Sequence, residues 1–295
     1  MAKSKKKIRE ENAIREAAQA NTERLETCNE AYTSGAFSYL RFLVHLLAAA
    51  QFCYGIYYYL FKLDWPEGLH EEEELKTRWG GKFKYLTFLD VIVQAIYHTV
   101  ALLNDLFGSN VVTVAPKSLL RQVRDYIFAT FAFPIAHNVC ISFWVIYLYD
   151  RELIFPAALD EIFPNWLNHV VHTNVALLAI MDMFTCFRRY PSRLAGVTGN
   201  VAFMILYVIW VNIVRYFSGQ WVYPLLEILP IPLRAVMFAG LVALSCDNSG
   251  DGKANENWLN SKPSEHNGIV LTITHIQCHS RRLANSVNLL INIGR

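Results

Sequence analysis

Several apolar stretches, each long enough to cross a lipid bilayer as a helix, constrain this chain more than any other feature of its sequence. A helix rises about 1.5 Å per residue, so roughly 20 apolar residues cross a hydrocarbon core of about 30 Å. Hydrophobic residues make up 54% of the chain and charged residues only 18%, a balance that is unusual for a water-soluble domain. The sequence therefore predicts an all-α fold, a polytopic bundle of transmembrane helices.

Five stretches qualify as membrane spans, and a sixth is marginal. Pro230 and Pro232 crowd the beginning of the sixth stretch, and Asp247 ends it early. We expect Pro134 to kink the third span. In chain order the expected spans are Phe37–Phe61, Tyr85–Leu103, Tyr126–Tyr149, Trp166–Phe184 and Gly199–Phe217, followed by the marginal Ile228–Cys246.

The spans divide the chain into a charged N-terminal extension (residues 1–36), a helical membrane domain (residues 37–246) and a polar tail (residues 247–295) whose composition is typical of disorder. Cytoplasmic loops of membrane proteins carry an excess of Lys and Arg. The extension and the loops after the second and fourth spans together carry about twice as many of these residues as the other loops. We therefore expect the N-terminus to be cytoplasmic. We expect the protein to reside in the plasma membrane or the endoplasmic reticulum.

Composition and motifs exclude several other classes of function. The formal net charge is only +2 and no glycine-rich phosphate loop is present, so we expect no nucleic-acid partner. The six cysteines have no CxxC pair and no histidine at ligand spacing, so neither a disulfide framework nor a metal site is predicted. Cys186 lies near the predicted cytoplasmic end of the fourth span, where some cysteines are palmitoylated but most are not.

The second span carries a stripe of polar side chains. Its members are Thr87, Asp90, Gln94 and His98. Their spacing of three, four and four residues places them on one face of a helix, which should point into the bundle. Such a stripe either forms hydrogen bonds between helices or lines a functional site or transport path. The spacing alone leaves these alternatives open.

The fourth span opens with the segment WLNHVVHTN, in which His169 and His172 share a helical face beside Asn168. Helical metal pairs usually sit four residues apart, so this spacing of three does not predict a metal site. A histidine can instead act as a general base on a nearby hydroxyl, or bond to neighbouring helices. Thr87 and His172 enter their spans from the same side at depths that differ by about 6 Å, so a Thr–His pair is geometrically allowed.

Five sequence blocks in one order carry a resemblance to a known family. They are KFKYLTFLDVIVQA, AFPIA with FWVIYLYDRELIFP, PNWLNHVVHT, RYPSR and GQWVYPLLE. Over roughly residues 37–245 the chain resembles the androgen-induced gene 1 family, whose members are multispanning threonine hydrolases of fatty acid esters of hydroxy fatty acids. The resemblance implies that Thr87 is the nucleophile and that His172, the second histidine of the NHxxH pair, is the general base.

The resemblance also implies a branched fatty acid ester as substrate, the bilayer as its source, and no cofactor. Asp90, Asn168 and His169 are candidates for supporting the catalytic histidine. After about Leu244 the chain lacks the long apolar stretch with which family members complete their last helix. We therefore expect an incomplete bundle, and the resemblance alone does not establish that this chain is active. The alternatives are a transporter or channel that uses the polar stripe, and a noncatalytic membrane adaptor acting through the N-terminal arm.

Overall fold

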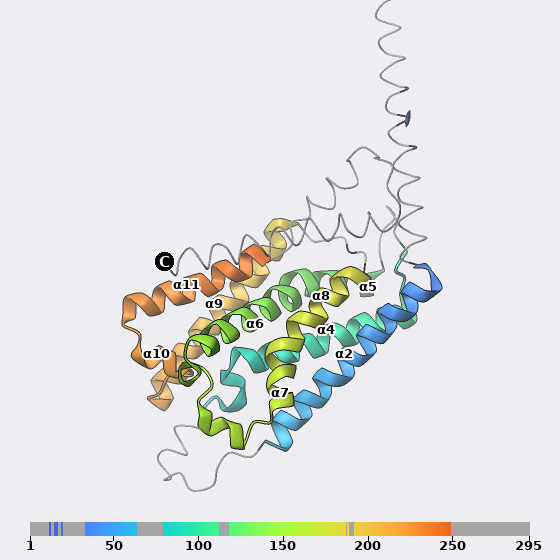
Figure 1. Ribbon diagram of the computed structural model, residues 1–295. Helices are drawn as coiled ribbons and strands as arrows, with labels where there is room; N and C mark the ends of the chain where they lie inside the picture. Colours follow the sequence, from blue (N-terminus) through green and yellow to red (C-terminus); the bar gives the residue numbers. More distant parts are fainter. Residues whose placement is uncertain are drawn as a thin grey trace, which may run out of the picture.

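The structure is a computed structural model that describes residues 33–63, 79–111, 118–186, 188 and 192–248, with the isolated positions 12, 15, 16 and 19. All regular secondary structure in these ranges is helical, which confirms the expected all-α class (Figure 1). Nearly all of the N-terminal extension, the loop at residues 64–78 and the polar tail beyond residue 248 lie outside the described residues.

Four helices in the described ranges are long and apolar enough to cross a membrane. They are α2 (Gly35–Phe61), α4 (Leu86–Phe107), a continuous helix made of α5 (Leu119–Ile127), a π-helical segment (Phe128–Ala132) and α6 (Phe133–Tyr149), and α9 (Arg193–Ser218). Two of these helices begin well before their predicted limits, each directly after a serine whose hydroxyl caps the first turn. The hydroxyl of Ser192, for example, accepts a hydrogen bond from the backbone N–H of Ala195 at 3.3 Å.

The predicted fourth span is also a continuous helix, although its apolar character is weaker. It consists of α7 (Asn165–His169), a π-helical segment (Val170–Asn174) and α8 (Val175–Thr185). It packs against α2, α4 and α6 (Figure 1). Polar residues interrupt its apolar sequence, and Asn168, His172 and Asp182 among them are buried inside the bundle.

The expected irregularity at Pro134 takes the form of a π-helical segment directly before it. Proline has no N–H, so it cannot donate to the carbonyl of Thr130 as a regular α-helix requires. The helix widens to a π turn over Phe128–Ala132 at this point. The helix also begins at Leu119, earlier than Tyr126, because the hydroxyl of Ser118 accepts from the N–H of Arg121 at 3.4 Å.

The marginal sixth span becomes two helices, as its prolines require. The short helix α10 (Pro224–Ile228) ends before Pro230, and α11 (Ile231–Asn248) begins directly after it. The apolar part of α11, Ile231–Leu244, is about 20 Å long, shorter than a hydrocarbon core of about 30 Å. α11 packs against α6 and α9.

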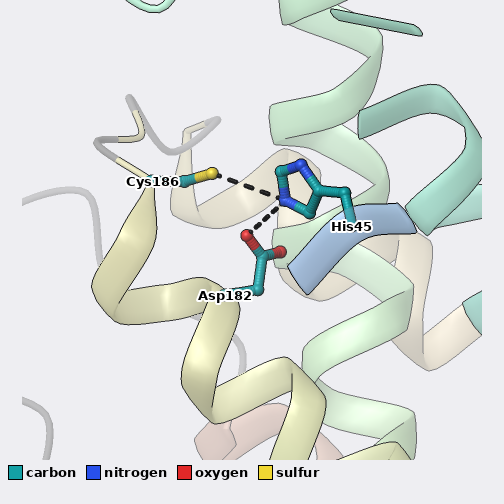
Figure 2. A group of neighbouring side chains, drawn as sticks. All are labelled: His45, Asp182 and Cys186. Atoms are coloured by element: carbon teal, nitrogen blue, oxygen red, sulfur yellow. Dashed lines mark hydrogen bonds and ion pairs between the residues drawn. The ribbon is translucent and has the colours of Figure 1, made fainter. Parts of the chain in front are cut away.

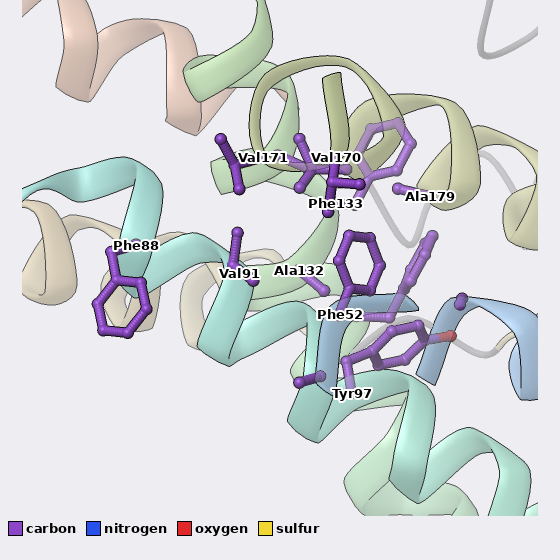
Figure 3. Close-up of a cluster of buried hydrophobic side chains, with 14 of the residues drawn as sticks. Phe52, Phe88, Val91, Tyr97, Ala132, Phe133, Val170, Val171 and Ala179 are labelled. Atoms are coloured by element: carbon purple, nitrogen blue, oxygen red, sulfur yellow. The ribbon is translucent and has the colours of Figure 1, made fainter. Parts of the chain in front are cut away.

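The inner faces of α2, α4, α6 and the helix that contains α8 share one apolar core. Phe52, Phe88, Tyr97, Phe133 and Val170 are among its buried members (Figure 3). A second apolar cluster joins α9 to the beginning of α4 and to α6.

The outer faces of the same helices are apolar as well. Leu47, Leu148 and Leu206 are each more than half exposed. A bundle that is apolar on both its inner and outer faces suits a lipid environment, in which helices satisfy their own backbone hydrogen bonds.

Candidate active site

Two tyrosine hydroxyls secure the beginning of α4, next to Thr87. The backbone N–H of Leu86 donates to the hydroxyls of Tyr207 and Tyr223, each at 3.1 Å. The Tyr207 hydroxyl in turn donates to the carbonyl of Lys84 at 3.2 Å. The first N–H groups of a helix have no acceptor within the helix, so these hydroxyls take the place of a side-chain cap. They tie the first turn of α4 to α9 and to the connection before α10.

Tyr223 comes from the GQWVYPLLE block, for which the sequence indicated no individual role. Its ring precedes α10, outside the spanning helices. Burial raises the pKa of its phenol, while hydrogen bonds with Tyr207 and the Leu86 N–H act in the opposite direction. The phenol therefore stays neutral at physiological pH and remains a hydrogen-bond donor.

The π-helical segment Val170–Asn174 presents His172 to the interior of the bundle. The ring is buried and lies flat against Phe143, with 3.5 Å between the ring centroids and 10° between the ring planes. Stacking on one face leaves only the two ring nitrogens for polar contacts. π-helical turns inserted in α-helices occur frequently at functional sites.

Each nitrogen of His172 has a distinct partner. Nδ1 lies 2.7 Å from the side-chain oxygen of Asn168 and 3.1 Å from its backbone oxygen. Both atoms are acceptors, so Nδ1 carries the hydrogen and Nε2 is left as an acceptor in the neutral ring. Nε2 lies 3.3 Å from the hydroxyl oxygen of Thr87. The Thr87 hydroxyl can donate to Nε2 in this arrangement.

The structure thus brings Thr87, His172 and Asn168 into one chain of contacts across two helices. A hydroxyl, a neutral imidazole that can accept its proton, and a group that orients the imidazole are the parts of an activated nucleophile. Catalytic hydrogen bonds are often long without substrate, so a separation of 3.3 Å suits this arrangement.

Asp90, the other candidate for orienting the histidine, has different contacts. Its Oδ1 accepts from Nε2 of Gln94 at 2.8 Å, and the same nitrogen lies 2.8 Å from the carbonyl oxygen of Ala132. Ala132 belongs to the first π-helical segment, so the stripe on α4 links this helix to the next span. Asp90, Gln94 and His98 are all fully buried. Within the described residues, Asn168 and not Asp90 contacts His172.

His169 points away from this chain of contacts. Its side chain is exposed, Nδ1 lies 3.1 Å from the hydroxyl of Thr173, and its ring stacks on Trp144 with 5.7 Å between centroids. The indole N–H of Trp144 donates to the same hydroxyl at 3.1 Å. His169 therefore helps to hold this helix against α6.

Comparison with known proteins places the chain in a family. The profile of the family described as FAR-17a/AIG1-like protein matches residues 40–247. The human androgen-induced gene 1 protein is 37% identical over 172 residues, which cover 56% of this chain and 72% of the relative. The mouse androgen-dependent TFPI-regulating protein is 37% identical over 172 residues, covering 58% of this chain and 74% of that protein.

A more distant relative covers more of both chains. A membrane protein of Schizosaccharomyces pombe is 24% identical over 211 residues, which cover 70% of this chain and 86% of that one. No solved structure matches the chain. With a family profile that matches most of its length and with spanning helices of the required size, the chain is a membrane protein that belongs to the FAR-17a/AIG1-like family.

Proposed function

We propose that this protein is a membrane-embedded carboxylic ester hydrolase that uses Thr87 as its nucleophile and His172 as its general base. The observation that carries the proposal is the contact of 3.3 Å between the Thr87 hydroxyl and Nε2 of His172. The substrate class that we propose is fatty acid esters of hydroxy fatty acids.

The proposed reaction has two halves. Nε2 of His172 accepts the hydroxyl proton as Oγ1 of Thr87 attacks the ester carbonyl carbon. The carbon–oxygen bond to the hydroxy fatty acid then breaks, and the departing oxygen takes the proton from His172. This leaves the acyl group as an ester on Thr87. A water molecule that gives its proton to His172 attacks this ester, releases the fatty acid and restores the hydroxyl.

Asn168 is a positioning residue in this scheme. It holds the hydrogen on Nδ1, so that Nε2 is free to accept a proton from Thr87. When the imidazole becomes positively charged, the two oxygens of Asn168 remain as acceptors for Nδ1 and stabilise that state.

The position of the pair suits a lipid substrate. Thr87 is the second residue of α4, and His172 lies about 10 Å along its helix from Asn165 at 1.5 Å per residue. Both are therefore near one end of the bundle, on the side that the distribution of Lys and Arg assigns to the outside or the lumen. A substrate with two acyl chains can keep its chains in the bilayer while its ester is held near the interface.

A fluorophosphonate probe that reacts with activated hydroxyls tests the nucleophile. We expect labelling of the full-length protein in membranes, and loss of labelling in Thr87→Ala and His172→Ala. Thr99→Ala is the matched control, because Thr99 lies on the same helix with its hydroxyl bonded to the carbonyl of Ala95 at 2.7 Å. Labelling of Thr87→Ala at the rate of the unaltered protein would refute the assignment.

The other readings of the sequence have less support. A transport path along α4 requires access for a hydrated ion, whereas Asp90, Gln94 and His98 are fully buried and two of them are bonded to each other. An adaptor that acts through the N-terminal arm depends on residues outside those described. Removal of residues 1–30 tests it directly. An adaptor of this kind loses its function without the arm, whereas a hydrolase of the proposed kind keeps its probe labelling.

A further inference from the structure

A second polar cluster lies at the opposite end of the bundle from Thr87. It brings together His45 from α2, Asp182 from α8 and Cys186, which follows α8 directly (Figure 2). His45 and Asp182 are fully buried and Cys186 is 2% exposed. The proposed ester hydrolysis uses none of these side chains.

The three side chains offer donor atoms that converge on one point. Nε2 of His45 lies 2.8 Å from Oδ1 of Asp182 and 3.7 Å from the sulfur of Cys186. All three donor atoms lie within 4.8 Å of one another. In a tetrahedral zinc site, nitrogen–oxygen and nitrogen–sulfur separations are about 3.3 and 3.6 Å. The sulfur is already at that separation from Nε2, and the carboxylate oxygen has to move away from Nε2 by about half an ångström. The oxygen and the sulfur, at most 4.8 Å apart, have to close to about 3.6 Å when the ion binds.

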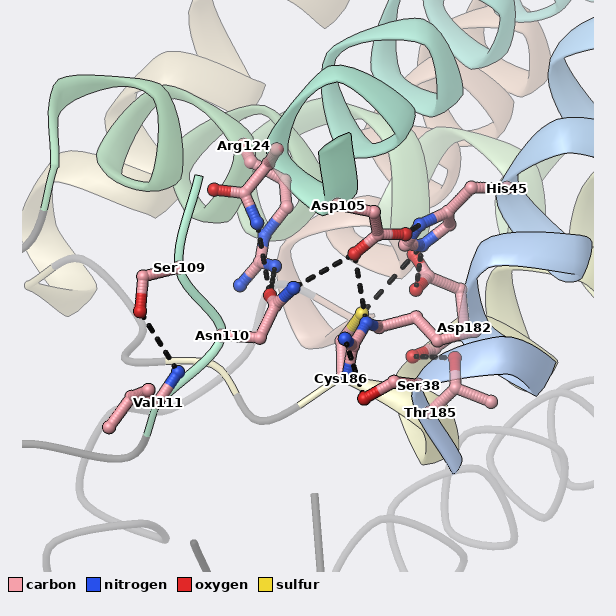
Figure 4. Close-up of polar contacts among 12 residues, drawn as sticks. Ser38, His45, Asp105, Ser109, Asn110, Val111, Arg124, Asp182, Thr185 and Cys186 are labelled. Carbon is pink, nitrogen blue, oxygen red and sulfur yellow. Dashed lines mark hydrogen bonds and ion pairs between the residues drawn. The ribbon is translucent and has the colours of Figure 1, made fainter. Parts of the chain in front are cut away.

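The groups behind these donors are arranged as they are around metal ligands. Nδ1 of His45 lies 2.5 Å from Oδ2 of Asp105, which leaves Nε2 for an ion (Figure 4). The other oxygen of Asp182 accepts from Tyr97 and from Arg188, which leaves Oδ1 for the same ion. A carboxylate behind a ligating histidine fixes the ring and raises its basicity.

The charge of the cluster can accommodate a divalent cation. Both nitrogens of His45 face carboxylate oxygens, and the sulfur of Cys186 lies on the Nε2 side of the ring. Nitrogen and sulfur ligands give up their hydrogens when a divalent ion binds, so the released protons offset the charge of the ion. Because burying an additional charge is costly, this exchange favours a metal that accepts a thiolate. Arg188 and Arg41 stay paired with the carboxylates of Asp182 and Asp105.

His98 supplies an independent sign that the cluster lacks a component. It is fully buried, and neither of its ring nitrogens has a hydrogen-bond partner in the described part of the chain. Its ring centroid lies 6.0 Å from that of His45. Buried imidazoles are normally hydrogen-bonded or bound to a metal. His98 is therefore the candidate for a fourth ligand, and water takes that position while its ring stays stacked on Phe52.

We infer that His45, Asp182 and Cys186 form a zinc site that joins α2 to the end of α8. Thiolate, imidazole and carboxylate ligands in a tetrahedral arrangement suit Zn²⁺ better than Ca²⁺ or Mg²⁺, which prefer sets of oxygen atoms. The site is distinct from the Thr87–His172 pair, and its ion cross-links two helices instead of taking part in ester hydrolysis.

Cobalt titration of the purified full-length protein tests the site, because tetrahedral Co²⁺ reports its ligands by absorption. We expect one equivalent of Co²⁺ to give visible d–d bands and a near-ultraviolet thiolate-to-cobalt band, both removed by Zn²⁺. Cys186→Ser should abolish the thiolate band, whereas Cys53→Ser, the matched control at an exposed cysteine, should keep it. Asp105→Asn should weaken Co²⁺ binding by about 10- to 100-fold through its effect on His45.

Thermal unfolding gives a second readout. Zn²⁺ should raise the unfolding midpoint of the unaltered protein and of Cys53→Ser but not of Cys186→Ser. Cys186→Ser carries the test because serine nearly matches cysteine in size and preserves the contacts of His45 with both carboxylates. An unaltered protein without a thiolate-to-cobalt band at stoichiometric Co²⁺, or equal bands in Cys186→Ser, would overturn the inference.

Discussion

Asn168→Ala isolates the part of the proposed mechanism that is specific to this geometry. The substitution removes the side-chain oxygen at 2.7 Å from Nδ1 of His172 and leaves the backbone oxygen at 3.1 Å. The ring keeps one acceptor for its hydrogen, so it still favours the tautomer that accepts from Thr87. We therefore expect the variant to be impaired but active.

The size of the effect follows from the single hydrogen bond that is lost. A neutral hydrogen bond contributes about 0.5–1.5 kcal/mol, and one to a charged group about 1.5–3 kcal/mol. Because His172 is charged in the transition state and neutral before it, the difference that affects the rate is about 1–2 kcal/mol. At 1.36 kcal/mol for each factor of ten, kcat should fall by roughly 5- to 30-fold. KM should change little, since Asn168 does not contact the substrate in this scheme.

The assay is the release of fatty acid from a branched ester by the purified protein, with kcat and KM measured separately. Asn174→Ala is the matched control, because Asn174 lies in the π-helical segment that contains His172 but donates to Gln51 at 3.0 Å instead of contacting His172. His172→Ala gives the residual kcat in the absence of the general base. A kcat for Asn168→Ala equal to that of Asn174→Ala would refute the positioning role. A kcat as low as that of His172→Ala would refute the contribution of the backbone oxygen.

Three further predictions concern the bundle. Gly199→Ala should lower the thermal unfolding midpoint by an amount equivalent to about 1–3 kcal/mol, because the added Cβ would lie 2.6 Å from Cγ2 of Thr130. In the same thermal scan Gly240→Ala should be neutral or stabilising, because no atom lies within 4 Å of the Cβ that it adds. Gln94→Leu removes the donor to Asp90 and to Ala132 and should cost on the order of 2–4 kcal/mol in denaturant unfolding; an unchanged midpoint would show that these bonds do not hold α4 in place. Tyr223→Phe should lower the free energy of unfolding by about 0.5–1.5 kcal/mol and slow hydrolysis, because it loosens the first turn of α4. Tyr216→Phe, at a side chain that is 82% exposed, should alter neither quantity.

The apolar stretches predict the helices because in a membrane the length and hydrophobicity of a segment dominate its structure. Matching depth from one membrane surface, which follows from residue counts, allows a contact between Thr87 and His172, and the family resemblance singles out this pair. The contacts of Asn168 do not follow from the sequence. Sequence spacing places both Asp90 and Asn168 one turn from a member of the pair, and only the packing of the helices distinguishes them.

Other features depend on tertiary contacts that leave no local pattern. The tyrosines that cap α4 come from 121 and 137 residues further along the chain than Leu86. Cys186 lies 141 residues from His45, so no ligand spacing could reveal their proximity. Its prolines mark the sixth span as marginal, but the point at which they divide it depends on how α10 and α11 pack.

Hydrolysis of a defined lipid tests the central claim most directly. Purified full-length protein is incubated with a panel of fatty acid esters of hydroxy fatty acids, and the released fatty acids are quantified by mass spectrometry for the unaltered chain, Thr87→Ala and Thr99→Ala. The account predicts release by the unaltered protein and by Thr99→Ala, and none above background by Thr87→Ala. Release by Thr87→Ala at the rate of the unaltered chain, or no release by the unaltered chain from any ester, would contradict it.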